Sequence, residues 1–120
     1  MRRDWNVIRT ILLRVEAMSA SDNPIRSDAL EGIESTVAGY HMWLLVDAKL
    51  VIGSCVDTGN GQFCHVRLLT WKGSDFLNNI RKDTMWERIK ETAEKKGLEL
   101  TFDSVVIIAK SIGAQLFSSL

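Results

Sequence analysis

The sequence predicts an α+β fold that is mostly helical, and three observations support that prediction. Apolar residues recur at helical spacing near the N-terminus, between residues 4 and 18. Two strand-like segments enclose the turn sequence "TGNGQ" within residues 50–70, which indicates a β-hairpin. Residues 101–120 carry apolar side chains at a spacing typical of a helix. At 120 residues, the chain fits one domain that can bury a core without disulfides or metals.

Composition excludes several classes of protein. Fifteen basic residues balance fifteen acidic ones, so net charge gives no overall attraction to nucleic acid or to an anionic membrane. Two cysteines are too few for a secreted disulfide scaffold. Neither a signal peptide nor an apolar run of roughly 20 residues occurs. The sequence therefore predicts a reduced, cytoplasmic protein with no membrane partner.

The first predicted helix covers about residues 4–18. Its core stripe contains Trp5, Ile8, Ile11, Leu12 and Val15. The next segment, residues 19–34, has too little periodicity to assign to one structure. Asn23 and Pro24 are suited to cap and begin a short helix that ends before Gly32. A short strand near Leu30 is the alternative, and the sequence leaves both open.

A second long helix is predicted from about Thr36 to Lys49, with Ser35 or Thr36 as its N-cap. Its apolar face is expected to contain Val37, Tyr40, Leu44, Leu45 and Ala48. The opposite face then contains Thr36, Gly39 and Trp43. A glycine inside a helix costs about 1 kcal/mol relative to alanine, so close approach by another group would explain Gly39.

The hairpin offers two turn registers. Asn60-Gly61 is suited to a type I′ turn and Gly59-Asn60 to a type II′ turn. In either register opposite residues share a face. One face is expected to hold Val51, Gly53, Cys55, Cys64, Val66 and Leu68, and the other Ser54, Val56, His65 and Arg67. The cysteines are interpreted as core-facing thiols, and four metal ligands do not converge, so no metal or other cofactor is expected.

After the hairpin, Thr70 is predicted to end the second strand and to cap a helix that buries Phe76, Leu77 and Ile80. Gly73 lies in the first turn of that helix, where a missing Cβ lets a neighbouring backbone approach. Trp71 is expected to cover the corner between hairpin and helix.

Two further helices are predicted at the C-terminal end. The first begins at Asp83, buries Trp86, Ile89 and Ala93, and stops at Gly97. The second is capped by Thr101, and its apolar face is wider than the ~100° stripe of a surface helix. That face contains Phe102, Val105, Val106, Ile108, Ala109, Ile112, Leu116 and Phe117. The helix either fills the core against the first helix or forms a homodimer, and the excess width favours the homodimer.

The order helix, short helix, helix, hairpin, helix is that of a winged helix-turn-helix. The predicted fold is a winged helix-turn-helix with a two-stranded β wing and additional C-terminal helices. It forms a single domain, residues 1–120, in which about 1–82 make up the winged-helix core. The remaining residues, about 83–120, form the C-terminal helices that are expected to dimerise.

Three segments resemble an uncharacterised family of bacteria and their prophages that is classed as a domain of unknown function: "MRRDWNVIRTILLRVE", "GYHMWLLVDAKLVIG" and "LLTWKGSDFLNNIRKDTMWERIKE". The resemblance covers nearly the whole chain. The passage from helix to wing is also similar to that of small winged-helix repressors. The chain departs from the family pattern at Lys49, where the helix-to-strand corner usually has Gly, and in a shortened segment before Ser35. The resemblance implies a phage or prophage setting and no particular activity.

Fold analogy favours a DNA-binding transcriptional regulator. The residues expected to contact DNA are Arg2, Arg3, Arg9, Arg26, Ser35, Thr36, Gly39, His41, Arg67 and Lys72. The predicted recognition helix argues against this function, because it contains no Lys, Arg, Asn or Gln between Ser35 and Ala48. Asp47, with Glu31 and Glu34 nearby, would repel phosphate.

The alternative function is a protein-interaction module that inhibits or recruits a host protein. Its expected surface is an exposed face around Trp43, together with Met42 and Gly39. No nucleophile with an orienting base is recognised, so the protein is predicted not to be an enzyme.

Overall fold

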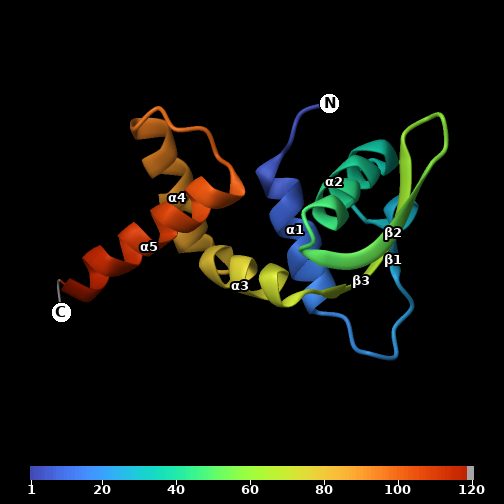
Figure 1. Cartoon of the computed structure of the whole chain (residues 1–120), viewed down its shortest axis with the longest axis horizontal. Helices are drawn as coiled ribbons and strands as arrows, with labels where there is room; N and C mark the ends of the chain where they lie inside the picture. The colour runs from blue at the N-terminus through green and yellow to red at the C-terminus, as the bar shows by residue number, and fades with distance from the viewer. Residues whose placement is uncertain (119–120) are drawn as a thin grey trace. The chain divides into compact units, whose positions relative to one another are not determined.

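Figure 1 shows the helices and the single small sheet of the computed structural model. The structure describes residues 1–118, with side chains described as far as Gln115. Within that part the protein is α+β and mostly helical, with five α-helices and a three-stranded antiparallel sheet. The elements are α1 (Trp5–Glu16), β1 (Ile25–Arg26), the 3₁₀ turn η1 (Ser27–Ala29), α2 (Ser35–Asp47), β2 (Val51–Asp57), β3 (Gln62–Leu69), α3 (Trp71–Ile80), α4 (Asp83–Lys95) and α5 (Phe102–Ser118).

The chain divides into two compact units, Met1–Ser74 and a second that begins at Asp75. The boundary falls inside α3, after its first turn. The N-terminal unit contains α1, α2 and all three strands, whereas the second contains the rest of α3 with α4 and α5. The division near residue 82 that the sequence suggests stays a prediction.

Helix α1 begins where the sequence predicts. Asp4 is its N-cap, because Oδ1 accepts hydrogen bonds from the backbone N–H groups of Asn6 and Val7 (2.9 and 3.4 Å). The predicted stripe is confirmed, with Trp5 half-buried and four residues fully buried: Ile8, Ile11, Leu12 and Val15. Helix α1 contacts α2 and β3, so its apolar face forms one wall of the core of the N-terminal unit.

The sheet has three strands in the order β1-β3-β2, which corrects the expected two-stranded wing. The additional strand is only two residues long, with Ile25 opposite Val66 and Arg26 opposite His65. Neither a short helix over residues 24–31 nor a strand near Leu30 is present; β1 and the single 3₁₀ turn η1 occupy that segment. A two-residue strand has no periodicity to recognise, since its pairing is determined by tertiary contact.

The hairpin turn is the Gly59-Asn60 alternative. Thr58 donates its backbone N–H to the Gly61 carbonyl (3.0 Å), so Gly59 and Asn60 lie between the bonded residues, and Gly59 has the positive φ (+84°) that a type II′ turn requires at its first central position. A bulge between Ile52 and Gly53 leaves Arg67 as the extra residue and pairs Ile52 with Leu68. Leu68 therefore points outward, 48% exposed, which corrects its predicted place on the inner face.

Cys55 and Cys64 are joined as a disulfide between opposite residues of β2 and β3. The expectation of two free thiols is therefore corrected. Both residues lie on the inner face of the sheet, where Cys64 is fully buried and its Sγ lies 3.4 Å from the Gly39 carbonyl oxygen. Opposite residues that share a face bring their Cβ atoms within reach of a disulfide. The shared face was predicted correctly, and the bond follows from it.

The joint between β3 and α3 confirms two predictions and corrects a third. The Thr70 hydroxyl accepts a hydrogen bond from the Gly73 backbone N–H (3.0 Å), so Thr70 caps α3. A Cβ on Gly73 would lie 1.9 Å from the Leu50 carbonyl oxygen, which confirms the close backbone approach. Trp71 does not cover the corner; it is 86% exposed, because the first turn of α3 directs it into solvent.

In the second unit, α4 and α5 pack against each other. The predicted apolar face of α4 is confirmed by the burial of Trp86, Ile89 and Ala93. In α5 the described part of the stripe is buried at Val105, Ile108, Ala109 and Ile112, while Leu116 and Phe117 lie outside the described side chains. Phe102 of α5 packs edge-on against Phe76 of α3, with ring centroids 5.0 Å apart. Ile107 is 67% exposed.

Candidate functional site

Helix α2 presents a different face to the core from the one predicted. Its buried residues are Ala38, Gly39, His41, Met42 and Leu45. The sequence assigned Gly39 and Met42 to an exposed interaction surface, and both are corrected by their burial. The error has a physical cause: apolar residues occur on every side of this helix, so the pattern does not define which side is inward.

Gly39 lies where α2 approaches the first residue of β3. A Cβ at this position would lie 1.9 Å from the Gln62 carbonyl oxygen, a distance that no side chain tolerates. The neighbouring Ser27 hydroxyl accepts the Cys64 backbone N–H (3.0 Å), so η1 is fixed beneath the same contact. Gly39 is therefore a packing residue between α2 and β3 and does not belong to an exposed surface.

His41 is 1% exposed, so it lies in the core and not on the surface where the sequence placed it. Its Nε2 accepts a hydrogen bond from the backbone N–H of Asp4 (2.8 Å). Nδ1 lies 2.7 Å from the Val37 carbonyl oxygen, to which it donates. A neutral ring protonated on Nδ1 satisfies both bonds. The Tyr40 ring packs edge-on against the His41 ring, with centroids 5.2 Å apart.

Glu34 caps α2, in place of the predicted Ser35 or Thr36. The carboxylate accepts hydrogen bonds from the Thr36 hydroxyl and from the backbone N–H groups of Thr36 (3.1 Å) and Val37 (3.4 Å). The Thr36 hydroxyl is the main cause that lowers the pKa of Glu34, and the backbone N–H of Thr36 comes second. Ser35 and Thr36 are exposed in the first turn of α2, next to this negative charge.

The outward side of α2 carries Thr36, Tyr40 and Trp43. Trp43 is 38% exposed and Tyr40 is half-buried. The hairpin turn lies beside the first turn of α2, because a Cβ built on Gly61 would be 3.9 Å from the Thr36 methyl group. Tyr40 belongs to this side and not to the core face on which the sequence placed it.

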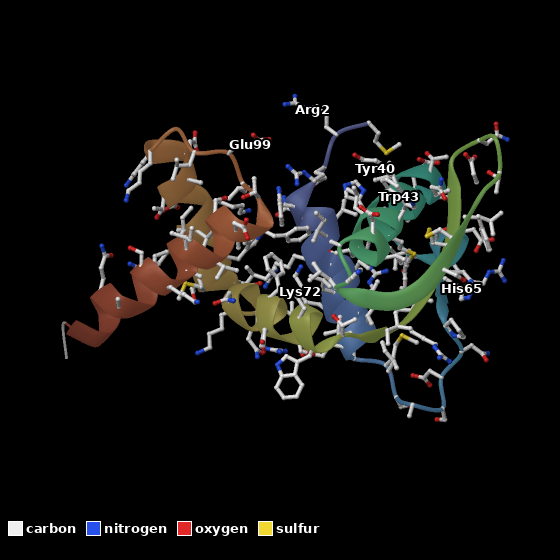
Figure 2. The ribbon with its side chains drawn as sticks, in the orientation of Figure 1. Arg2, Tyr40, Trp43, His65, Lys72 and Glu99 are labelled. Atoms are coloured by element: carbon white, nitrogen blue, oxygen red, sulfur yellow. A yellow bond between two sulfur atoms is a disulfide. The ribbon has the colours of Figure 1, made fainter. Side chains whose placement is uncertain are left out.

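Residues 1–3 form an arm that leaves α1 next to α2. Asp4 is held twice, since its side chain caps α1 and its backbone N–H bonds His41 of α2. Arg2 and Arg3 are exposed, and the Arg3 guanidinium lies over the Trp5 ring at 5.6 Å. In Figure 2, Arg2 extends from the arm at the top of the view, and Tyr40 and Trp43 lie below it on α2. We call Arg2, Arg3, Thr36, Tyr40 and Trp43 the arm–helix surface.

The remaining predicted cations lie elsewhere. Arg26 is on the outer face of the sheet, where it pairs with Asp28 (2.6 Å) and lies 5.8 Å from the Phe63 ring centroid. Arg67 lines a hollow of about 220 Å³ with Pro24 and Leu68. The Lys72 ammonium reaches the Ala48 carbonyl at 3.5 Å, beyond the C-terminal end of α2.

Arg9 is half-buried on α1. The base of the arm that carries Arg2 and Arg3 is thus bonded to the middle of α2, Lys72 reaches the C-terminal end of that helix, and Arg26 and Arg67 lie at the sheet. Among residues 1–118, no three His, Cys, Asp or Glu side chains gather as metal ligands. No helix in the described part of the chain is long and apolar enough to cross a membrane.

Comparison with known proteins gives two matches of sequence. Residues 2–99 match a family described as "Hypothetical protein (DUF2513)". An "Uncharacterized protein" of Haemophilus influenzae is 35% identical over 118 residues, which cover 98% of this chain and all of that relative. No solved structure matches the chain.

Proposed function

For a chain that belongs to the family described as "Hypothetical protein (DUF2513)", we propose a function in DNA binding, as a cytoplasmic transcriptional regulator of phage or prophage type. The observation that supports this proposal most strongly is the topology of the N-terminal unit. The element order is α1-β1-η1-α2-β2-β3, and the sheet order is β1-β3-β2. A winged helix has this order with a helix in the place of η1, and α2 would then be the recognition helix and the β2–β3 hairpin the wing.

The first helix of the helix-turn-helix is shortened to the single 3₁₀ turn η1. Its packing role is retained, because η1 contacts both α2 and β3. Thr36 at the start of α2 and the hairpin turn are neighbours, as a helix in the major groove and a wing beside it would require.

Binding of DNA is tested by fluorescence anisotropy of a labelled duplex from upstream of the protein's own gene. We expect an affinity that decreases steeply as salt is raised from about 50 mM, and a lower affinity for a scrambled duplex of equal length. Thr36→Glu adds a negative charge to the outward side of α2 and should weaken binding roughly tenfold, about 1.4 kcal/mol. Thr92→Glu, which changes the same residue type in α4, is the matched control. Absence of binding at low salt would contradict the proposal.

Exposure of Trp43 supports a second function, in which α2 binds a host protein that the protein inhibits or recruits. A partly exposed Trp beside a half-buried Tyr is typical of interaction hot spots. Trp43→Ala would then abolish binding to a purified partner protein, while Arg2→Ala would leave it intact. The two functions are distinguished by salt, because an aromatic contact depends on salt far less than phosphate contacts do.

We also propose a homodimer through α5, supported by Ile107, a large apolar side chain that is 67% exposed on that helix. Sedimentation analysis of the wild type and of Ile107→Asp tests it. Dimers that persist in the variant would place the contact elsewhere.

A further inference from the structure

We propose that His41 positions the N-terminal arm so that Arg2 and Arg3 bind DNA phosphates alongside α2. This inference rests on the proposed function, and it assigns the cations that α2 itself lacks. His41 acts as a positioning residue, since it is buried and does not reach the surface.

The arm starts from a fixed point. The Asp4 backbone N–H donates to His41 Nε2 (2.8 Å), and the Asp4 side chain caps α1. The His41 ring is in turn oriented by Nδ1, which donates to the Val37 carbonyl within α2 (2.7 Å). Arg3 is therefore the direct neighbour of a residue, Asp4, that is hydrogen-bonded to His41 in the middle of α2. An arm this short reaches only the surface next to that helix, because three residues span at most ~10 Å.

Charge on the arm–helix surface makes the arm necessary for DNA binding. Neither α2 nor the turn at residues 58–61 contains Lys or Arg. Glu34 caps α2 and Asp57 ends β2, so the N-terminal end of α2 and the hairpin beside it carry negative charge, whereas Lys49 and Lys72 lie at its C-terminal end. Phosphate binding needs compensating cations, and Arg2 and Arg3 supply two on the arm whose base, Asp4, is bonded to His41 of α2.

The bond between the Asp4 N–H and His41 requires a neutral His41 ring that carries its proton on Nδ1. Nε2 must carry a lone pair to accept the Asp4 N–H, and Nδ1 must carry the proton to donate to Val37. If residue 41 had no hydrogen-bond acceptor, Asp4 would be held only by its own side chain, which caps α1. Arg2 and Arg3 would then sample many directions, and their phosphate contacts would carry an ordering cost.

The experiment measures the slope of log K against log salt by anisotropy, with the same duplex. Each phosphate contact contributes roughly 0.9 to the slope, so Arg2→Ala with Arg3→Ala should reduce it by about 1.8. The control, Lys95→Ala with Lys96→Ala, removes two adjacent exposed cations from the second unit and should leave the slope unchanged. His41→Phe keeps both arginines and should weaken binding and reduce the slope, whereas His41→Gln, which retains an acceptor, should restore both.

The outcomes separate the two proposals. If the wild type does not bind DNA, both are wrong. Binding with an unchanged slope in the double Arg variant leaves the proposed function standing and overturns the role of the arm. If only His41→Phe has no effect, the arginines bind phosphate but His41 does not position them.

A second measurement covers the case in which His41→Phe does not fold. Amide hydrogen exchange of Asp4 in the wild type reports the anchor directly. We expect exchange slower than in an unstructured peptide. Exchange as fast as in the peptide would overturn the positioning role of His41.

Discussion

Lys49 and Gly97 occupy the same backbone position in two copies of one helix-ending motif. Lys49 has φ 63° after α2, and Gly97 has φ 64° after α4. In each case the next amide bonds the carbonyl five residues back, Leu50 to Leu45 and Leu98 to Ala93. The residue itself bonds the carbonyl three back, Lys49 to Val46 and Gly97 to Glu94. This is the Schellman motif, in which glycine is the usual residue.

Lys49→Gly should therefore stabilise the protein. A left-handed conformation costs a non-glycine residue roughly 1–2 kcal/mol, and part of that gain is offset by the greater freedom of glycine in the unfolded chain. We expect the free energy of unfolding, measured by urea titration, to rise by about 0.5–1 kcal/mol. The reciprocal change, Gly97→Lys, meets no atom within 4 Å and should lower it by a similar amount. A destabilised Lys49→Gly would mean that the lysine side chain makes a contact worth more than the strain.

Gly39→Ala should destabilise strongly or prevent folding. Its methyl group would lie 1.9 Å from the Gln62 carbonyl oxygen, and neither backbone can move without separating α2 from β3. Overpacking of this kind costs about 1–3 kcal/mol or more. Gly113→Ala is the matched control, since Gly113 is also helical and meets nothing within 4 Å. That variant should gain up to about 1 kcal/mol. Thermal unfolding by circular dichroism compares the two, and equal midpoints would contradict the close approach.

Thr70→Val should weaken the joint between β3 and α3. The hydroxyl accepts the Gly73 N–H (3.0 Å) and donates to the Lys49 carbonyl (2.7 Å), so valine loses both bonds at nearly constant volume. Loss of an N-cap costs about 0.5–2 kcal/mol, which urea titration resolves. Thr70→Ser keeps the hydroxyl and should retain most of the stability. A valine variant as stable as the wild type would show that the hydroxyl does not stabilise the joint.

Glu34 should contribute stability that disappears in acid. Its pKa is lowered in the folded protein by hydrogen bonds from Thr36, so the carboxylate form is favoured by folding. That contribution is complete above the unfolded value of 4.5 and is lost as pH falls through the lower folded value. The difference in stability between wild type and Glu34→Gln should be largest near neutral pH and should shrink below 4.5. If the difference in the free energy of unfolding stayed constant between about pH 7 and about pH 3, the charge of the Glu34 carboxylate would not be involved.

The sequence predicted those elements whose pattern is clear on its own. Helix α1 and helix α4 each bury one apolar stripe, and both stripes were predicted correctly. Helix α2 is apolar on all sides, so its inward face is chosen by the backbone contact of Gly39 with Gln62, which a one-dimensional pattern does not contain. Strand β1 is too short to show alternation, and the bulge at Gly53 reverses Leu68 without any marker except the glycine itself.

The candidate surface was predicted only in part. Arg2, Thr36 and Trp43 were recognised by residue type, but nothing in the sequence indicated that the arm and α2 meet. The bond that joins them links residues 37 positions apart and uses the backbone N–H of Asp4, a donor that every non-proline residue has. His41 was misassigned for the same reason, because a histidine that accepts from a main-chain amide looks in sequence like any exposed one.

The glycine contacts restrict how this protein can evolve. At positions 39, 53 and 73, a Cβ would lie within 2.3 Å of a carbonyl oxygen of another segment. All three contacts belong to the N-terminal unit. No single substitution by a residue with a Cβ is therefore tolerated at these three positions, whatever the protein binds. A lineage that lost one of these glycines would have to rebuild the spacing of helix and strand in the same step.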